Sequence, residues 1–273
     1  MKKRSGAILC VCAIVFAAIM ISGCSVKMEE PVFVKNLICT EDMDVDIMYI
    51  SGMTGEKKVK SVEIPDAPKG IETVVYDEES ETISGYSLHT IHMGVSSDNL
   101  NEDSGLAEPL AFSRLNITWD DGTETVADVG TIEIRSVKQQ GLQLIGEEKN
   151  DQQGKSLQWT SSDFQAEKKL NITGVNIPYQ EKLEPIISNI TINQVPIAEI
   201  DSKHPIKLEK GDTCTVSYSC DEGYKFPYGR VAIDAQLIGV DEQGNKQAAL
   251  VHMQPDPWIE EDISGYLKTV KEQ

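Results

Sequence analysis

The segment SGYSLHTIHMG, residues 84–94, holds the residues best suited to chemistry. Gly85, Ser87 and His89 begin like the G-x-S-x-G turn that presents a nucleophilic serine, but His89 replaces the closing glycine. That motif also needs a sharp turn from a strand into a helix, whereas the alternation here predicts a strand that continues to Val95. The segment therefore does not predict a nucleophile elbow.

The same segment offers two possible metal ligands, His89 and His92. A helix would place them on one face, but residues three apart on a strand point to opposite faces. We therefore expect exposed or hydrogen-bonded strand histidines, and we predict neither a metal site nor a bound cofactor.

Clusters of acidic residues at 77–81, 99–105 and 119–124 raise the question of calcium. The middle cluster has the one-three-five spacing of an EF-hand loop at its start, but Gly105 comes one position late and no glutamate closes the loop. In a chain with 44 acidic residues such clusters are expected by chance, and solvated turns are the expected structure.

The stretch YKFPYGR, residues 224–230, is the best candidate for a binding surface. On an extended backbone Tyr224, Phe226, Tyr228 and Arg230 share one face, and these residue types are enriched at binding hot spots. Pro227 restricts the segment to an edge strand or a loop, where a partner could reach it. The alternative is that the rings fill the end of a hydrophobic core.

The N-terminus has the layout of a secretory signal peptide, with three basic residues at 2–4 and an uncharged run from Ala7 to Ile21. Fifteen residues make a helix of about 22 Å, which is short of the roughly 30 Å hydrocarbon core of a bilayer. The run ends in Ile21-Ser22-Gly23-Cys24, which resembles the lipobox of bacterial membrane lipoproteins. The resemblance implies that the leader is cut before Cys24, that Cys24 is lipidated, and that the protein is anchored on the extracytoplasmic face of the cell membrane.

Charge and cysteine content narrow the partners and the chemistry. Removing the leader takes three of the 25 basic residues and none of the 44 acidic ones, so the formal charge changes from -19 to -22. A surface this acidic repels phosphate, so nucleic acid is not an expected partner. Beyond Cys24 the mature chain has Cys39, Cys214 and Cys220, and we expect at least two of them to be buried thiols.

Most of the mature chain reads as short strands of β-branched and alternating residues, with hairpin turns at Asp121-Gly122 and Gly244-Asn245. Apolar residues recur at helical spacing only near the C-terminus, from Ile259 to Val270. The pattern predicts an all-β chain of two tandem immunoglobulin-like β-sandwich domains with a short C-terminal helix. The predicted parts are a signal peptide (1–23), a tether (24–31), an N-terminal sandwich (32–138) and a C-terminal sandwich with the terminal helix (139–273).

These features favour a non-catalytic, lipid-anchored surface protein that binds a protein or another envelope component. A surface hydrolase with a carboxylate or His89-centred site is the first alternative, because sandwiches also carry enzymes. A solute-binding lipoprotein of a transporter is the second alternative, although the chain lacks the strand and helix alternation expected of a two-lobed receptor.

Overall fold

The computed structural model describes residues 28–53, 57–97, 100–101, 105–151, 157–221, 227–255, 259 and 262–271. The chain is all-β with a short C-terminal helix, as the sequence predicts. The described part contains no helix that is both long enough and apolar enough to span a bilayer. Cys24, Tyr224 and Phe226 lie outside the described residues.

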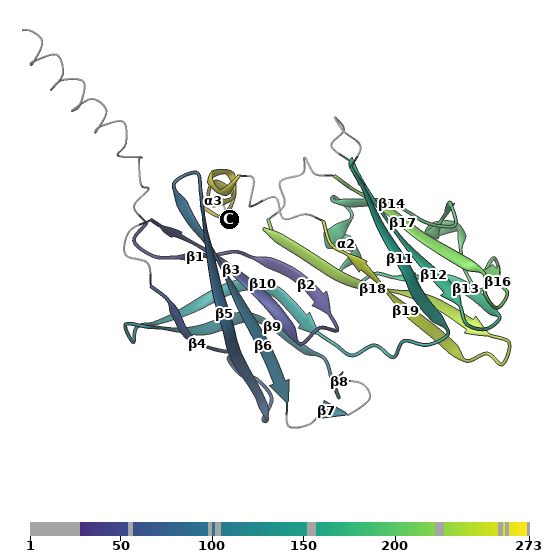
Figure 1. Ribbon diagram of the computed structural model, residues 1–273, viewed down its shortest axis with the longest axis horizontal. Coiled ribbons are helices and arrows are strands. Elements are labelled where there is room, and N and C mark those ends of the chain that lie inside the picture. The colour runs from purple at the N-terminus through teal and green to yellow at the C-terminus, as the bar shows by residue number, and fades with distance from the viewer. Residues whose placement is uncertain are drawn as a thin grey trace, which may run out of the picture.

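The N-terminal lobe is a sandwich of two sheet layers (Figure 1). Its first layer is the sheet β1-β3-β6-β5, and its second is formed by β10, β9 and β4. Inward residues from both layers, such as Ile47, Ile91 and Trp119, form one buried cluster. The strand bounds are β1 (Val32–Phe33), β3 (Asp44–Gly52), β4 (Val59–Glu63), β5 (Ile71–Ile83), β6 (Tyr86–Ser97), the short pair β7 (Leu100–Asn101) and β8 (Gly105–Leu106), β9 (Leu110–Trp119) and β10 (Glu124–Ile134).

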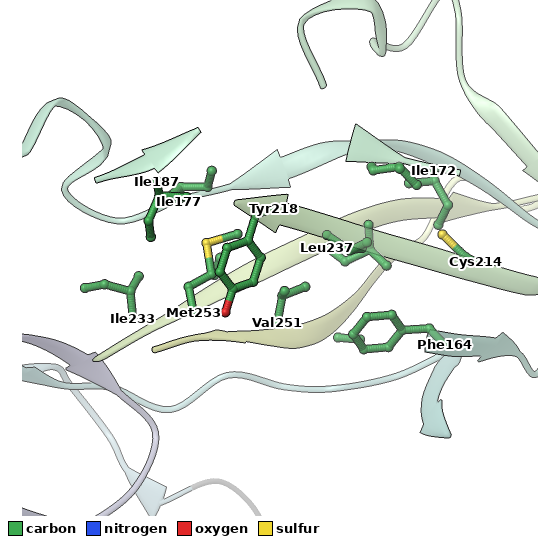
Figure 2. Close-up of a cluster of buried hydrophobic side chains, with 14 of the residues drawn as sticks. Phe164, Ile172, Ile177, Ile187, Cys214, Tyr218, Ile233, Leu237, Val251 and Met253 are labelled. Atoms are coloured by element: carbon green, nitrogen blue, oxygen red, sulfur yellow. The ribbon is translucent and has the colours of Figure 1, made fainter. Parts of the chain in front are cut away.

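The C-terminal lobe packs the sheet β11-β12-β17-β14-β15 against β16, β13, β18 and β19. Figure 2 labels members of its core from both layers: Phe164 and Tyr218 belong to the first sheet, and Leu237 and Val251 belong to the second. The bounds are β11 (Leu142–Asp151), β12 (Leu157–Ala166), β13 (Leu170–Asn176), α2 (Gln180–Leu183), β14 (Ile187–Ile192), β15 (Val195–Pro196), η1 (Ile197–Glu199), β16 (Ile206–Leu208), β17 (Thr213–Asp221), β18 (Arg230–Asp241) and β19 (Lys246–Met253).

One strand, β2 (Asn36–Thr40), joins the two lobes. It pairs in parallel with β10 on one side and with β18 on the other, so a single sheet in the order β16-β13-β18-β2-β10-β9-β4 runs through both lobes. Its side chains alternate between the two cores, with Leu37 and Cys39 in the C-terminal cluster and Ile38 in the N-terminal one. Burial on both faces explains its near-continuous apolar sequence.

The backbones of β2 and β10 approach each other closely at Gly130. Gly130 has φ +85° and sits at a register shift between Asp128 and Ile132. A Cβ atom there would overlap the backbone nitrogen and carbonyl oxygen of Asn36. Glycine is required at this position because both the backbone angle and the available space exclude a side chain.

The helix α3 (Ile263–Lys271) packs on the N-terminal lobe. Ile263, Tyr266 and Leu267 contact the outer face of the first sheet at Met48 and Ile50. The Tyr266 hydroxyl also accepts a hydrogen bond from the backbone N–H of Lys35 at 2.7 Å. The helix that follows the last strand of the C-terminal lobe thus packs on the N-terminal lobe (Figure 1).

The hairpin turns and the thiols follow the sequence-based expectations. Gly122 and Gly244, both with φ +81°, lie in the turns that join β9 to β10 and β18 to β19. Cys39, Cys214 and Cys220 are buried free thiols. Burial raises the pKa of Cys39 and of Cys214 to about 12, so neither thiol ionises at neutral pH.

The alternating residues 32–39 are divided between two sheets: the chain breaks at 34–35, so that β1 pairs with β3 while β2 enters the shared sheet. One local expectation is wrong. The acidic cluster at 77–81 is not a turn, because it lies inside β5 and pairs with β6. Ladder pairing with a long partner strand there outweighs the low strand propensity of the carboxylates.

Candidate functional site

A groove of about 610 Å³ lies where the two lobes meet. It is built around the carboxyl end of β2, the turn at 41–43, the beginnings of β3 and β18, and the end of β19. Apolar side chains such as Ile38, Ala232 and Met253 contribute to its lining. Both lobes therefore shape this groove, because β2 and β18 run side by side only in the shared sheet.

Arg230, the last residue of the predicted aromatic and basic surface, lines the groove. Its Nη1 atom lies 3.1 Å from Asp46 Oδ2 and donates a hydrogen bond to the Asp46 backbone oxygen at 3.1 Å. The other carboxylate oxygen of Asp46 lies 2.7 Å from His92 Nδ1. Arg230 on β18 is thus fixed to β3 of the N-terminal lobe, and its side chain is only 16% exposed.

A second polar group in the lining is formed by Asp234, His252 and Glu41. Asp234 accepts hydrogen bonds from His252 Nδ1 at 2.7 Å and from the backbone N–H of Glu41 at 2.8 Å. Burial raises the pKa of Asp234, but these two hydrogen bonds outweigh it and hold the pKa below its ordinary value. The hydrogen bond to Asp234 raises the pKa of His252, whereas burial and the nearby Asp234 charge raise the pKa of Glu41.

Carboxylates outnumber basic groups in this groove. Its lining contains five acidic residues, Glu41, Asp42, Asp44, Asp46 and Asp234, against Arg230 and His252. Arg230 and His252 are each already paired with one of these acids. The lining as a whole therefore favours a positively charged guest that also carries apolar surface.

The residues of the predicted binding surface that the structure describes have different partners. Tyr228 is half-buried, packs against the C-terminal core, and lies beneath Lys182 Nζ at 5.9 Å from the ring centroid. Arg230 instead pairs with Asp46 of the other lobe. Tyr224 and Phe226, like the lipidation residue Cys24, fall in segments that the structure does not describe.

His89 and His92 lie on opposite faces of β6, as strand geometry predicts. His92 points outward to Asp46, whereas His89 is 4% exposed and stacks on the Tyr49 ring with centroids 4.3 Å apart. In the described part of the chain, no three His, Cys, Asp or Glu side chains are arranged to hold a metal ion. His89 also contacts Ser51 and Glu78, which form a separate polar cluster inside the N-terminal lobe.

The sequence alone did not single out most residues of these polar groups, among them Ser51, Asp234 and His252. A detectable signal was available for Ser51, because Val45, Ile47 and Tyr49 alternate toward the core and Ser51 takes the next inward position. Local sequence carries no comparable signal for Asp234 and His252, since their roles depend on a groove that both lobes build.

Comparisons with known proteins do not indicate a function for this chain. No protein-family model matches the chain, and no curated protein matches it. Among solved structures, the chain is similar to a protein of unknown function from Porphyromonas gingivalis W83. The two are 12% identical, the match covers 83% of this chain and 96% of the other, and the TM-score is 0.24, so the likeness carries no argument.

Proposed function

We propose that this chain is a lipid-anchored, extracytoplasmic binding protein made of two immunoglobulin-like sandwiches, and that its ligand occupies the groove between the lobes. The observation that carries the proposal is the groove itself. It has the volume typical of ligand sites, a partly apolar lining, and polar groups held at fixed positions by hydrogen bonds from both lobes.

The chemistry of the lining suggests the ligand class. Five carboxylates against one arginine and one histidine favour a cationic group, and the apolar residues favour an aliphatic or aromatic part beside it. A lysine- or arginine-containing segment of another envelope protein combines these two features.

The partner can be sought by photocrosslinking in intact cells. A photoreactive phenylalanine analogue at Met43, in the groove lining, should crosslink to a discrete partner. The same analogue at Val126, an exposed position of β10 that does not line the groove, serves as the matched control. Indistinguishable crosslinking patterns from the two positions would rule out the groove as the binding site.

The anchor is tested separately. Labelled fatty acid should be incorporated into the wild-type protein and not into Cys24→Ala, and the variant should leave the membrane fraction. If both proteins are labelled and fractionate alike, the proposed anchor is wrong while the groove proposal stands.

A further inference from the structure

The polar cluster inside the N-terminal lobe has the connectivity of a nucleophile, a base and an acid. Ser51 Oγ lies 2.9 Å from His89 Nε2, and His89 Nδ1 lies 3.3 Å from Glu78 Oε1. The three residues come from β3, β6 and β5, three adjacent strands of one sheet. The imidazole therefore contacts the hydroxyl with one nitrogen and the carboxylate with the other.

Further contacts fix the carboxylate and the ring. Oε1 of Glu78 accepts a hydrogen bond from the Tyr49 hydroxyl, and Oε2 accepts one from the backbone N–H of Val59 at 2.9 Å. Burial raises the pKa of Glu78, but hydrogen bonds from His89, Tyr49 and Val59 outweigh it and hold the pKa below its usual range. Tyr49 also stacks on the imidazole with an interplanar angle of 1°.

These contacts assign the tautomer of the histidine. An ionised Glu78 can only accept, so a neutral His89 carries its hydrogen on Nδ1 and leaves Nε2 as an acceptor for the Ser51 hydroxyl, which also lies 3.3 Å from the Gly52 backbone oxygen. A neutral imidazole held in this way is the arrangement that activates a serine.

We propose that Ser51, His89 and Glu78 form an acyl-transfer relay that hydrolyses small esters, an activity that goes beyond the binding role proposed above. Ser51 Oγ attacks the ester carbonyl carbon while its proton passes to His89 Nε2. The ester C–O bond then breaks, and the leaving alcohol takes that proton. Water, deprotonated by His89, attacks the acyl-serine, releases the carboxylic acid and restores the serine. Glu78 is a positioning residue that remains a carboxylate throughout.

The surroundings limit the substrate to small esters. Ser51 is 9% exposed and does not itself line the neighbouring cavity, so a bulky acyl group has no room beside it. His89 and Glu78 are in the wall of a cavity of about 360 Å³ between the edge strands β4 and β5, which is separate from the groove between the lobes. This cavity is at the lower end of the volumes typical of small-molecule sites.

A small dialkyl fluorophosphonate tests the relay on the full chain, because an activated serine displaces its fluoride and retains the phosphonyl group. Mass spectrometry should place the adduct on Ser51 in the wild-type protein. We expect no adduct with Ser51→Ala and a labelling rate at least 100-fold lower with His89→Gln, the lower end of the contribution typical of a general base. Ser80→Ala, which removes an exposed serine from the wall of the same cavity, should be labelled like wild type.

Glu78→Gln tests the positioning role. The labelling rate at saturating probe should fall at least 10-fold, while the probe concentration that gives half the maximal rate should not change. Circular dichroism establishes that each variant is folded. The position of the adduct in the wild-type protein is determined without any variant. The proposal is overturned if the wild-type protein stays unlabelled, if its adduct lies on another residue such as Ser80, or if folded His89→Gln reacts at the wild-type rate.

Discussion

The groove between the lobes and the Ser51–His89–Glu78 relay are both polar, but different forces hold them in place. The groove depends on the backbone pairing of β2 with β10 and β18, and its ion pairs are partly exposed additions to that frame. The relay depends on side-chain hydrogen bonds inside one sandwich, where His89 is 4% exposed. Removing a side chain should therefore lower the free energy of unfolding little in the groove and much in the relay. A change in the backbone, by contrast, should destabilise the groove most.

The largest effect is expected from Gly130→Ala, which acts on the frame of the groove. A positive φ and a clash with the Asn36 backbone together should lower the free energy of unfolding by about 4 kcal/mol. Gly122→Ala is the matched control, because Gly122 has a similar φ of +81° and no atom within 4 Å of the added Cβ, so only about 1 kcal/mol is expected. Urea unfolding measures both, and equal losses would show that the β2–β10 contact does not constrain the fold.

Glu78→Ala should produce the next largest loss, because it breaks the relay. The substitution removes the carboxylate that His89, the Tyr49 hydroxyl and the Val59 N–H share, although the Tyr49 hydroxyl keeps the Lys57 backbone oxygen at 3.2 Å. The expected loss is about 3 kcal/mol. Glu79→Ala, which alters the neighbouring 74% exposed side chain, should change the free energy of unfolding by less than about 0.5 kcal/mol. If the two variants unfold at the same urea concentration, the buried cluster does not stabilise the lobe.

This contrast also explains what the sequence could predict. The alternation that places Val45, Ile47 and Tyr49 toward a core is local, and so are the glycine turns at 122 and 244; the all-β fold followed from such signals. The pairing of β2 with residues 230–233 joins segments about 190 positions apart, and no local pattern encodes it.

The candidate sites were predictable to the same limited extent. Arg230 stood out because its neighbours are aromatic, but its partner Asp46 belongs to a strand of the other lobe. His89 stood out as a histidine near a serine, but the serine that it contacts is Ser51 and not Ser87. The register in which the strands pair determines which side chains meet. That register depends on the pairing of the whole sheet and not on any single segment.

A smaller loss is expected when the arginine of the groove is removed. Arg230→Ala should lower the free energy of unfolding by about 1 kcal/mol, because Asp46 keeps His92 as a partner and is 36% exposed to solvent. Lys207→Ala, at an exposed position of β16, is the control and should have no measurable effect. A loss as large as that of Glu78→Ala would mean that the Arg230–Asp46 ion pair contributes as much to stability as the Glu78 contacts of the relay.

The smallest effect is the pH dependence of the Asp234–His252 pair in the groove. The hydrogen bond to Asp234 raises the folded-state pKa of His252 above 6.5, so its contribution to stability is fully present below pH 6.5 and is lost as pH rises through the raised pKa. Burial raises the pKa of Asp234, but stronger hydrogen bonds lower it below 3.8, so its contribution is fully present above pH 3.8 and is lost as pH falls through the lowered pKa.

The pair should therefore stabilise the fold most between about pH 4 and pH 6.5, the interval that these two opposite shifts define. Because the His252 side chain is 47% exposed, the contribution should stay below about 1 kcal/mol and weaken in high salt. Urea unfolding of wild type and His252→Gln at pH 5.5 and pH 8.5 measures it, and the difference between the two proteins should shrink at the higher pH. A difference that grows with pH would show that His252 stabilises the groove as a neutral residue, through packing against its lining and not through its charge.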